Sequence, residues 1–365
     1  MHPTIAFVDI NAIKNNVRRF KTHIGKAVQF CAVLKADGYG HGAIPVARAA
    51  LAAGADCLAV AFIPEALELR YAGITAPILV LGYLPAEDYA MAVKHDLTVT
   101  LMTKACAAAL NETARRLHKP VKIHIKINTG MNRLGVHYEL AAQFVKTLNQ
   151  MEFLQICGIY SHFSKADESN LAYTLQQLTR FNQALADIAT TGIDVGVKHI
   201  CNSAGTLNVP DAHLDMVRVG ISLYGYYPSE FTLRTVDLQP AMSLRSVVSQ
   251  IIDCAPGEEI SYGGMYVTDR PTKLAVIPIG YADGFMRAQS NQACALLHGK
   301  RVRQVGRICM DQCMFDITDI DNVKIDDEII LFGDELPVEE VAERLHTINY
   351  EIVCAISKRV PRKYI

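Results

Sequence analysis

The sequence predicts a two-domain α/β protein, with an N-terminal (β/α)8 barrel of the TIM type over residues 1–234 and a mainly antiparallel β domain over residues 235–365. From residue 29 to about residue 220, apolar runs of strand length alternate with helix-like segments, and eight strands with helical crossovers is the number that closes such a barrel. Beyond about residue 235 the segments are β-rich and are separated by Pro-Gly, Gly-Gly and Gly-Lys turns. An open doubly wound sheet is the alternative for the first part.

The predicted barrel strands are short apolar runs, at 29–35, 57–61, 77–81, 97–100, 121–127, 154–160, 197–201 and 215–219. Helical patterns lie between them, at 43–53, 64–72, 86–94, 103–118, 138–149 and 169–190. Pro64 and Thr103 are favourable residues for helix starts. The β domain should contain strands at 241–254, 259–267, 273–279, 293–297, 301–318 and 328–332. Its single predicted helix covers 337–346 and begins at Pro337.

Composition excludes several classes of protein. Half of the residues are hydrophobic and 20% are charged, which suits a large packed core. The formal net charge of −1 gives no reason to expect a nucleic acid or a membrane surface as partner. No secretory signal and no bilayer-spanning run is found, so the 10 cysteines are expected to be reduced thiols of a cytoplasmic protein. Cys309 and Cys313 lack a second ligand pair, so no metal is expected.

A lone lysine, Lys35, ends the first predicted barrel strand and is followed by a turn that contains Gly38, Gly40 and Gly42. At the mouth of a buried strand an amine loses hydration, which favours the neutral form that attacks carbonyls. The alternative is that Lys35 reaches into solvent. The glycine spacing matches neither the dinucleotide fingerprint nor a Walker loop, although such a turn before a helix can still receive a phosphate.

In a barrel, residues that follow the strands meet at one mouth. Here they would bring together a lysine, two arginines, two histidines and residues suited to a phosphate, namely Lys35, Tyr39, Arg133, His162, His199, Ser203, Arg218 and Gly220. Taken singly, His162 is explained as a core histidine and Arg133 as a partner of a surface carboxylate. Their convergence favours a functional site.

This set of residues suits a phosphorylated aldehyde held as a Schiff base on Lys35, for which pyridoxal 5'-phosphate is the obvious candidate. Arg218 is informative because a guanidinium cannot accept a proton and would keep the pyridine nitrogen neutral. That disfavours transamination and decarboxylation and leaves proton exchange at Cα. A racemase needs a base on each face of its substrate, and Lys35 serves only one. The β domain offers Tyr262 and Tyr281, which lie in turns, as candidates for the site, although isolated tyrosines are usually packing residues.

The segment Ala32–Gly42 resembles the pyridoxal-phosphate signature of alanine racemases, and the resemblance covers nearly the whole chain. It includes residues 126–131, 133–135, 162–163, 202–203, 218–220, 261–263, 280–284 and 309–312. The last three segments lie in the β domain, which makes the resemblance specific to racemases among barrel enzymes that use this cofactor.

The resemblance implies a homodimer in which the β domain of one subunit completes the active site of the other. Lys35 would carry the cofactor and act as base on the D side, and Tyr262 of the partner subunit, tuned by His162 beside Arg218, would act on the L side. Arg133 would contact the cofactor phenolate oxygen, and Arg133 and the Met310 N–H of the partner subunit would bind the substrate carboxylate. The remaining implied roles are phosphate binding by Tyr39, Ser203, Gly220, Ile221 and Tyr350, and narrowing of the entrance by Tyr281 and Tyr350.

Two residues depart from the family pattern. Asn128 stands where members commonly have Asp, and Asn132 where they often have Gly. Lys126 matches a lysine that is carbamylated in some members, and in them the anionic carbamate orients the arginine that Arg133 matches. Because Asn128 changes the local charge, a carbamate, a separately bound anion and a simple pair between Lys126 and a carboxylate all remain open.

The resemblance therefore implies an alanine racemase that supplies D-alanine for peptidoglycan. A serine or broad-spectrum racemase of the same fold is the near alternative, and Tyr350 favours alanine because it leaves little room beyond a methyl group. A non-catalytic pyridoxal-phosphate carrier is a second class, which lacks a β domain with an equivalent of Tyr262. A Schiff-base aldolase or decarboxylase is a third, and Arg218 disfavours decarboxylation.

Overall fold

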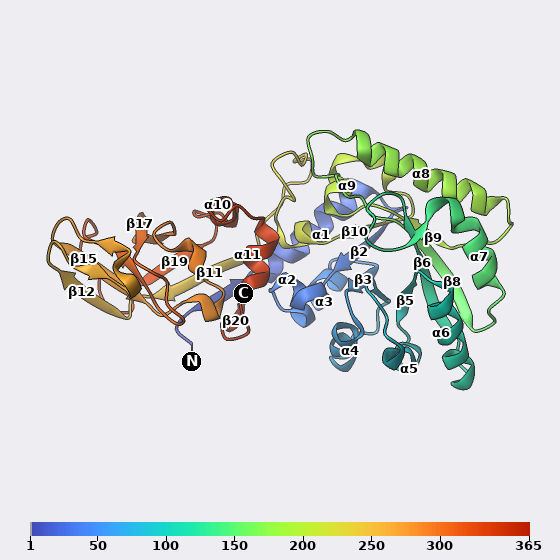
Figure 1. Ribbon diagram of the computed structural model, residues 1–365, viewed down its shortest axis with the longest axis horizontal. Helices are drawn as coiled ribbons and strands as arrows, with labels where there is room; N and C mark the ends of the chain where they lie inside the picture. The colour runs from blue at the N-terminus through green and yellow to red at the C-terminus, as the bar shows by residue number, and fades with distance from the viewer. Residues whose placement is uncertain (1) are drawn as a thin grey trace. The chain divides into compact units, whose positions relative to one another are not determined.

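The computed structural model describes residues 2–365, which form two compact units (Figure 1). The barrel unit consists of Ala12–Gly38 and Ala43–Gln239. The β unit consists of residues 2–11, Tyr39–Gly42 and Pro240–Ile365. The chain thus passes into the β unit at Pro240, a little beyond the predicted boundary between residues 234 and 235.

The barrel unit is built on a parallel sheet of eight strands in the order β10-β2-β3-β4-β5-β6-β8-β9. The strands are β2 (Gln29–Val33), β3 (Cys57–Val60), β4 (Ile78–Val80), β5 (Thr98–Leu101), β6 (Val121–Asn128), β8 (Leu154–Tyr160), β9 (Val197–His199) and β10 (Met216–Val219). The two ends of this order are joined by backbone hydrogen bonds of 3.1 Å from Asp215 N to Lys198 O and from Arg218 N to Cys201 O. The predicted barrel is confirmed, because an open sheet would leave these ends apart.

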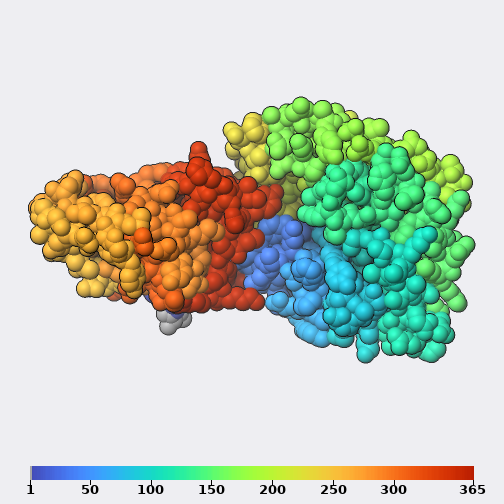
Figure 2. All heavy atoms as spheres, viewed as in Figure 1, coloured from blue at the N-terminus to red at the C-terminus, as the bar shows by residue number. Residues whose placement is uncertain are grey.

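Helices follow the strands as the sequence predicts and form an outer layer (Figure 1). They are α3 (Ala43–Ala52), α4 (Ile63–Tyr71), α5 (Tyr89–Lys94), α6 (Lys104–Arg116), α7 (Ala141–Asn149) and α8 (Ala172–Ala189). The Thr103 side chain caps α6 by accepting a hydrogen bond of 3.2 Å from Cys106 N. The segments that contain these helices are coloured from blue to green in Figure 2 and form a continuous surface on the face drawn. Among residues 2–365 no helix combines the length and the apolar character needed to cross a bilayer.

The β unit contains a nine-stranded sheet in the order β12-β15-β18-β17-β16-β19-β11-β1-β20. Its strands are β12 (Gln250–Cys254), β15 (Thr272–Ile277), β18 (Cys313–Asp316), β17 (Lys300–Val305), β16 (Cys294–Leu297), β19 (Glu328–Phe332), β11 (Met242–Val247), β1 (Ile5–Val8) and β20 (Arg362–Tyr364). Every pairing is antiparallel except that of β1 with β20. A second small sheet pairs β13 (Glu259–Ile260) with β14 (Tyr266–Val267). The mainly antiparallel β domain is confirmed.

Three features differ from the predicted organisation. Strand β1 lies in the sheet of the β unit rather than in the barrel unit, because it pairs with β11 and β20. The prediction that residues 1–234 form one domain is therefore wrong for this strand. The β unit also has two helices instead of one, α10 (Val338–Arg344) and α11 (Asn349–Ala355). The structure also contains two helices that were not predicted, α1 (Ile10–Ile24) and the short α9 (Ser203–Asn208).

Candidate active site

The chain turns in a left-handed conformation directly after β2. Ala36 has φ 54° and ψ 52°, and Asp37 has φ 52° and ψ 50°. This conformation costs a residue with a side chain about 1–2 kcal/mol, so it needs support from its surroundings. Ala36 N donates a hydrogen bond of 2.7 Å to the Glu65 side chain on α4, and the Asp37 carboxylate accepts one of 2.8 Å from the first N–H of α3. The turn thereby fixes where Lys35 leaves the barrel.

Lys35 itself is exposed in this chain. The expectation that it loses its hydration at the strand mouth is wrong, and the alternative, a side chain that reaches to the surface, describes it better. Strand β2 ends at Val33, two residues before Lys35.

Four cationic side chains surround His162, which follows β8. Burial holds the pKa of His162 well below its ordinary value, and the neighbouring charges of Lys126, Arg218, Arg133 and Lys35 lower it further. The imidazole is therefore neutral near pH 7. The predicted convergence of Lys35, Arg133, His162 and Arg218 is thus observed within the barrel unit.

Arg218 is a buried residue of β10 whose donors all point to neutral acceptors. Its Nη2 donates to Ser161 O at 2.9 Å and Ile200 O at 3.1 Å, and lies 3.1 Å from His162 Nδ1. Its Nη1 lies 2.6 Å from His199 Nδ1. A guanidinium has no acceptor, so both histidines must accept through Nδ1 and carry their proton on Nε2.

A polar chain continues from His199 into the barrel interior. His199 Nε2 lies 2.9 Å from His124 Nδ1, and the Tyr160 ring stacks on the His199 ring at 4.7 Å between centroids. The Tyr160 hydroxyl lies 2.8 Å from the Thr100 hydroxyl. Burial lowers the pKa of His124 to about 4 and raises the pKa of Tyr160 to about 12. The interior under Arg218 is therefore polar and neutral, and it does not compensate the charge of the arginine.

Lys126, on β6, is a second buried basic side chain without an acidic partner. Its side chain is buried, and its Nζ lies 4.2 Å from the centroid of the Tyr160 ring. Burial lowers the pKa of Lys126 well below the ordinary value, and the charges of Arg218 and Arg133 add to this. No ion pair involves Lys126 or Arg218 in residues 2–365, so the interpretation of Lys126 as the partner of a carboxylate is wrong. A buried guanidinium and a buried amine that both lack a carboxylate partner favour an anionic group at this place.

Lys126, Arg133 and His162 line one small pocket of the barrel unit together with Asn128. The Asn128 Oδ1 accepts hydrogen bonds from Gly130 N at 3.0 Å and Asn132 N at 3.1 Å. An aspartate would accept the same bonds, so the departure at Asn128 keeps the loop and removes one negative charge. Asn132 has φ 56°, a conformation that glycine and asparagine tolerate, which explains the second departure.

Gln177 braces this pocket from α8 and was not among the predicted site residues. It is fully buried, and its Oε1 accepts from Ser164 N at 2.9 Å. Its Nε2 donates to His162 O at 3.0 Å and to the Thr129 hydroxyl at 3.3 Å. One side chain thus ties the segment after β6, which carries Arg133, to the segment after β8, which carries His162.

The segments after β9 and β10 also meet. The Ser203 hydroxyl, at the start of α9, accepts a hydrogen bond of 2.9 Å from Gly220 N, which precedes Ile221. All three residues are buried. The predicted grouping of Ser203 with Gly220 at the ends of the last two strands is confirmed.

The remaining predicted site residues lie in the β unit. The rings of Tyr39 and Tyr350 are 6.1 Å apart, and burial together with Tyr350 raises the pKa of Tyr39 above its usual range. Tyr262 follows Ser261, which has φ 67° and donates from its hydroxyl to Arg307 O at 2.7 Å. The Tyr262 side chain is 71% exposed, so the turn presents it to the outside of this unit.

Tyr281 and Met310 lie on two adjacent segments of the β unit and are both exposed. Tyr281 N donates to Cys309 O at 3.0 Å, and Ala282 N donates to Met310 O at 3.1 Å. The predicted entrance residue and the predicted carboxylate-binding residue are therefore held side by side by the backbone.

These features define a class: a (β/α)8-barrel protein with an attached β unit, whose strand ends form a cationic site for an anionic ligand next to a lysine amine. Residues 2–365 hold no group of three or more His, Cys, Asp and Glu side chains suited to a metal ion. The family model for the alanine racemase N-terminal domain matches residues 8–228, and that for the alanine racemase C-terminal domain matches residues 241–364. The chain belongs to the alanine racemase family.

Relatives and solved structures agree over the full length. An alanine racemase of Desulfovibrio desulfuricans is 45% identical over 100% of this chain and 98% of its own. One of Methanococcus maripaludis is 45% identical over 100% of this chain and 99% of its own. The structure of alanine racemase from Clostridium difficile matches with a TM-score of 0.97 at 40% identity and covers 100% of this chain and 96% of its own. The structure from Bacillus anthracis, described with bound L-Ala-P, matches with a TM-score of 0.95 at 39% identity and covers 100% and 95%.

Proposed function

We propose that this protein is a pyridoxal-phosphate-dependent alanine racemase that interconverts L- and D-alanine. The observation that carries the proposal is Arg218, a buried guanidinium beside His162 that donates only to neutral acceptors. An arginine in this place offers a ring nitrogen only hydrogen-bond donors, so it supports Cα proton exchange over chemistry that needs a protonated pyridine. The family and its relatives support alanine as the substrate.

The donor set fits the cofactor. Its phosphate would be bound by Ser203, Gly220, Ile221, Tyr39 and Tyr350, and Lys35 would hold it covalently through its amine. Arg133 would contact its phenolate oxygen, and Arg218 its ring nitrogen. When bound, the cofactor withdraws electron density from the substrate Cα and so acidifies the proton there. The uncompensated charge of Arg218 suits an anionic group of this kind.

We further propose two bases on opposite faces of the substrate, in a homodimer. Lys35 takes or gives the Cα proton on the D side, and Tyr262 of the partner subunit does so on the L side. The exposed position of Tyr262 supports a role toward a second chain. His162 accepts from Arg218 through Nδ1, which leaves its Nε2–H to donate to the phenolic oxygen of that tyrosine.

Arg133 and the backbone N–H of the partner subunit's Met310 would bind the substrate carboxylate, and Tyr281 and Tyr350 would restrict the side chain to little more than a methyl group. The D-alanine would serve peptidoglycan synthesis in the cytoplasm. All 10 cysteines are free, which agrees with a reducing compartment.

Lys126 is proposed to carry a carbamate. Its buried neutral amine would attack CO2 and lose one proton, which converts a neutral group into an anion beside Arg133. Asn128 supplies no negative charge, so the carbamate would be the group that orients the Arg133 guanidinium in this pocket.

The test is spectroscopic and chemical. The purified protein should show the visible absorbance of bound pyridoxal phosphate, lose it on borohydride reduction, and yield one labelled peptide that contains Lys35. Circular dichroism should then follow racemisation of L-alanine faster than that of L-serine. Faster turnover of serine would make the protein a serine or broad-spectrum racemase, and a coloured protein without turnover would make it a carrier. A colourless protein that takes up no cofactor would refute the proposal.

A further inference from the structure

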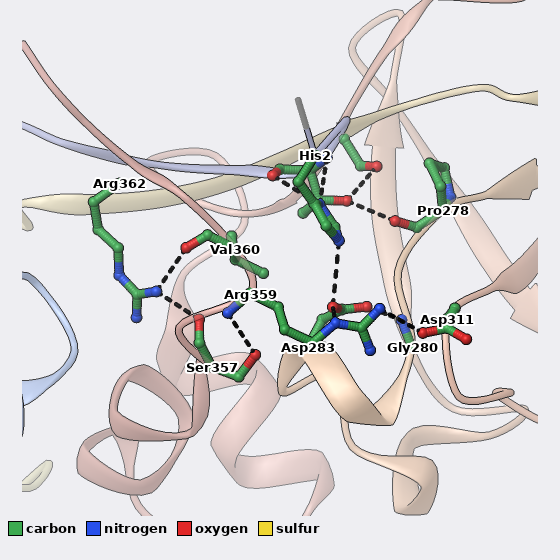
Figure 3. A network of polar contacts seen from close by, with 11 residues as sticks. His2, Pro278, Gly280, Asp283, Asp311, Ser357, Arg359, Val360 and Arg362 are labelled. Atoms are coloured by element: carbon green, nitrogen blue, oxygen red, sulfur yellow. Dashed lines mark hydrogen bonds and ion pairs between the residues drawn. The ribbon is translucent and has the colours of Figure 1, made fainter.

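A charged bridge joins the two segments of the β unit that carry Tyr281 and Met310 (Figure 3). Arg359 Nη2 lies 2.7 Å from Asp311 Oδ1, next to Met310, and Arg359 Nε lies 3.5 Å from Asp283 Oδ1, two residues after Tyr281. None of the three charged residues was predicted from the sequence as part of the site. One guanidinium thus reaches a carboxylate on each segment.

Asp283 is the fixed end of this bridge. It is fully buried, and its Oδ2 accepts a hydrogen bond of 3.0 Å from Gly280 N. His2 lies on its other side, with Nε2 3.3 Å from Asp283 Oδ1. On the far side of the ring, His2 Nδ1 lies 3.1 Å from both Thr4 N and Thr4 O, which holds the imidazole beside the carboxylate (Figure 3). A buried carboxylate needs such partners, so Asp283 holds both the turn and Arg359 in place.

The two segments pack backbone against backbone at Gly280. A Cβ atom at this position would lie 2.2 Å from Cys309 O and 2.3 Å from Met310 O. Any shift of the Asp311 segment therefore displaces the turn that carries Tyr281. Arg359 adds a side-chain link between the same two segments, outside this backbone contact.

We propose that Arg359 is a positioning residue for substrate recognition. Through Asp283 and Asp311 it steadies the two backbone-paired segments, and with them the position of Tyr281, which would narrow the entrance, relative to the Met310 N–H, which would bind the substrate carboxylate. The inference rests on the proposed function and deepens it, because it assigns selectivity for a small amino acid to a residue that touches no substrate. A lysine cannot replace it, since a single ammonium does not present the planar fork that reaches two carboxylates at once.

The experiment compares R359M and R359K with the wild-type holoenzyme. Both variants should raise the KM for alanine about tenfold and lower the preference for alanine over serine in kcat/KM by a similar factor, because a small misplacement of a binding group is costly. The kcat for alanine should stay within about twofold, since Lys35, Tyr262 and Arg218 are untouched. The visible spectrum of the bound cofactor should not change.

R270M is the matched control. Arg270 also pairs with a carboxylate of the β unit, Asp319, at 2.6 Å, and its side chain is 48% exposed, as is that of Arg359. R270M should leave KM and the substrate preference unchanged. If R359M fails to fold, D311N removes only the exposed end of the bridge and should raise KM in the same direction. In a double-mutant cycle the effects of R359M and D311N on KM should not add.

Equal shifts for R359M and R270M, or an unchanged ratio of alanine to serine turnover in R359M, would overturn the inference while the proposed function stands. A wild-type protein that binds the cofactor but does not racemise alanine would overturn the proposed function and this inference with it. A loss of thermal stability without a change in KM would assign Arg359 a structural role only.

Discussion

The Nη1 atom of Arg218 lies 2.6 Å from Nδ1 of His199, and this contact sets the direction of a whole series of hydrogen bonds. Arginine can only donate, so His199 accepts at Nδ1 and donates from Nε2 to His124 Nδ1, 2.9 Å away. Protonating either histidine would place a donor against a donor or a second charge beside Arg218. The barrel interior therefore requires neutral histidines in one tautomer.

The free energy of unfolding should decrease as the pH is lowered, and His124 is one of the groups that cause this. Its pKa is about 4 in the folded chain, against 6.5 for an ordinary histidine, so between these values the unfolded chain binds a proton that the folded one does not. The contribution of His124 is complete above pH 6.5 and is lost as the pH falls toward 4, which lowers the free energy of unfolding by about 3 kcal/mol. Urea unfolding at several pH values measures this slope.

H124Q should reduce that slope, because a glutamine oxygen still accepts from His199 but does not titrate, while the buried His162 and His199 keep their own lowered pKa values. H118Q, which replaces an exposed histidine, should keep the wild-type slope. An H124Q protein as sensitive to acid as the wild type would show that His124 is not the group responsible.

Q177E should uncouple the two segments that Gln177 ties together. A glutamate still accepts from Ser164 N but cannot donate to His162 O, and it brings a buried charge against that carbonyl. We expect a loss of at least about 2 kcal/mol in the free energy of unfolding and a loss of activity, measured by urea unfolding and initial rates. Q176E, on the exposed side of the same helix, should be nearly neutral, and equal effects of the two changes would contradict the role of Gln177.

K126M tests the proposed carbamate. Wild-type protein supplied with 13C-bicarbonate should show one protein-bound carbamate resonance by NMR, which K126M should lack. Loss of the charge-assisted contact to Arg133 should lower kcat/KM about tenfold. K122M, on the exposed face of the same strand, should keep both the resonance and the activity. A wild-type protein without the resonance, whose activity rises with added chloride, would show that a separate anion takes this place.

Y262F separates the two proposed bases. In D2O the variant should still exchange the Cα proton of D-alanine through Lys35, while exchange of L-alanine and racemisation in both directions fall at least about 100-fold. Y266F changes a neighbouring tyrosine with no assigned role and serves as the control. Exchange of both enantiomers at wild-type rates in Y262F would remove Tyr262 from the reaction.

The barrel strands were predictable because strands buried on both faces read as continuous apolar runs, and the site residues because such strands end at one mouth. Strand β1 was not predictable, because its four residues form a strand only by pairing with β11 and β20, which lie more than two hundred residues further along the chain. The glycines that follow Lys35 predicted a turn there. Its left-handed conformation at Ala36 depends on Glu65, a contact that no local pattern reports.

Gln177 and Arg359, which support the site, were not predicted because their contacts are also made by distant segments. For Gln177, however, the sequence pattern contains a usable signal. The buried residues of α8 are Thr174, Gln177, Phe181, Ala184 and Ile188. A glutamine on this stripe, spaced three and four residues apart, is an amide on the core face of a helix and therefore requires buried partners. Arg359 left no comparable signal, because its two carboxylate partners come from separate segments of the chain.

The place of β1 between β11 and β20 has a consequence for the order in which the protein forms on the ribosome. Strands β2 to β10 emerge in succession and, with few exceptions, pair with neighbours in sequence, so the barrel unit can assemble while synthesis continues. Residues 5–8 emerge earlier than any of them, yet the parallel partner of β1, Arg362–Tyr364, emerges last. Strand β1 is therefore made before every other strand of its sheet, and its parallel pairing can form only after the strands of the barrel unit and the rest of the β unit have been made.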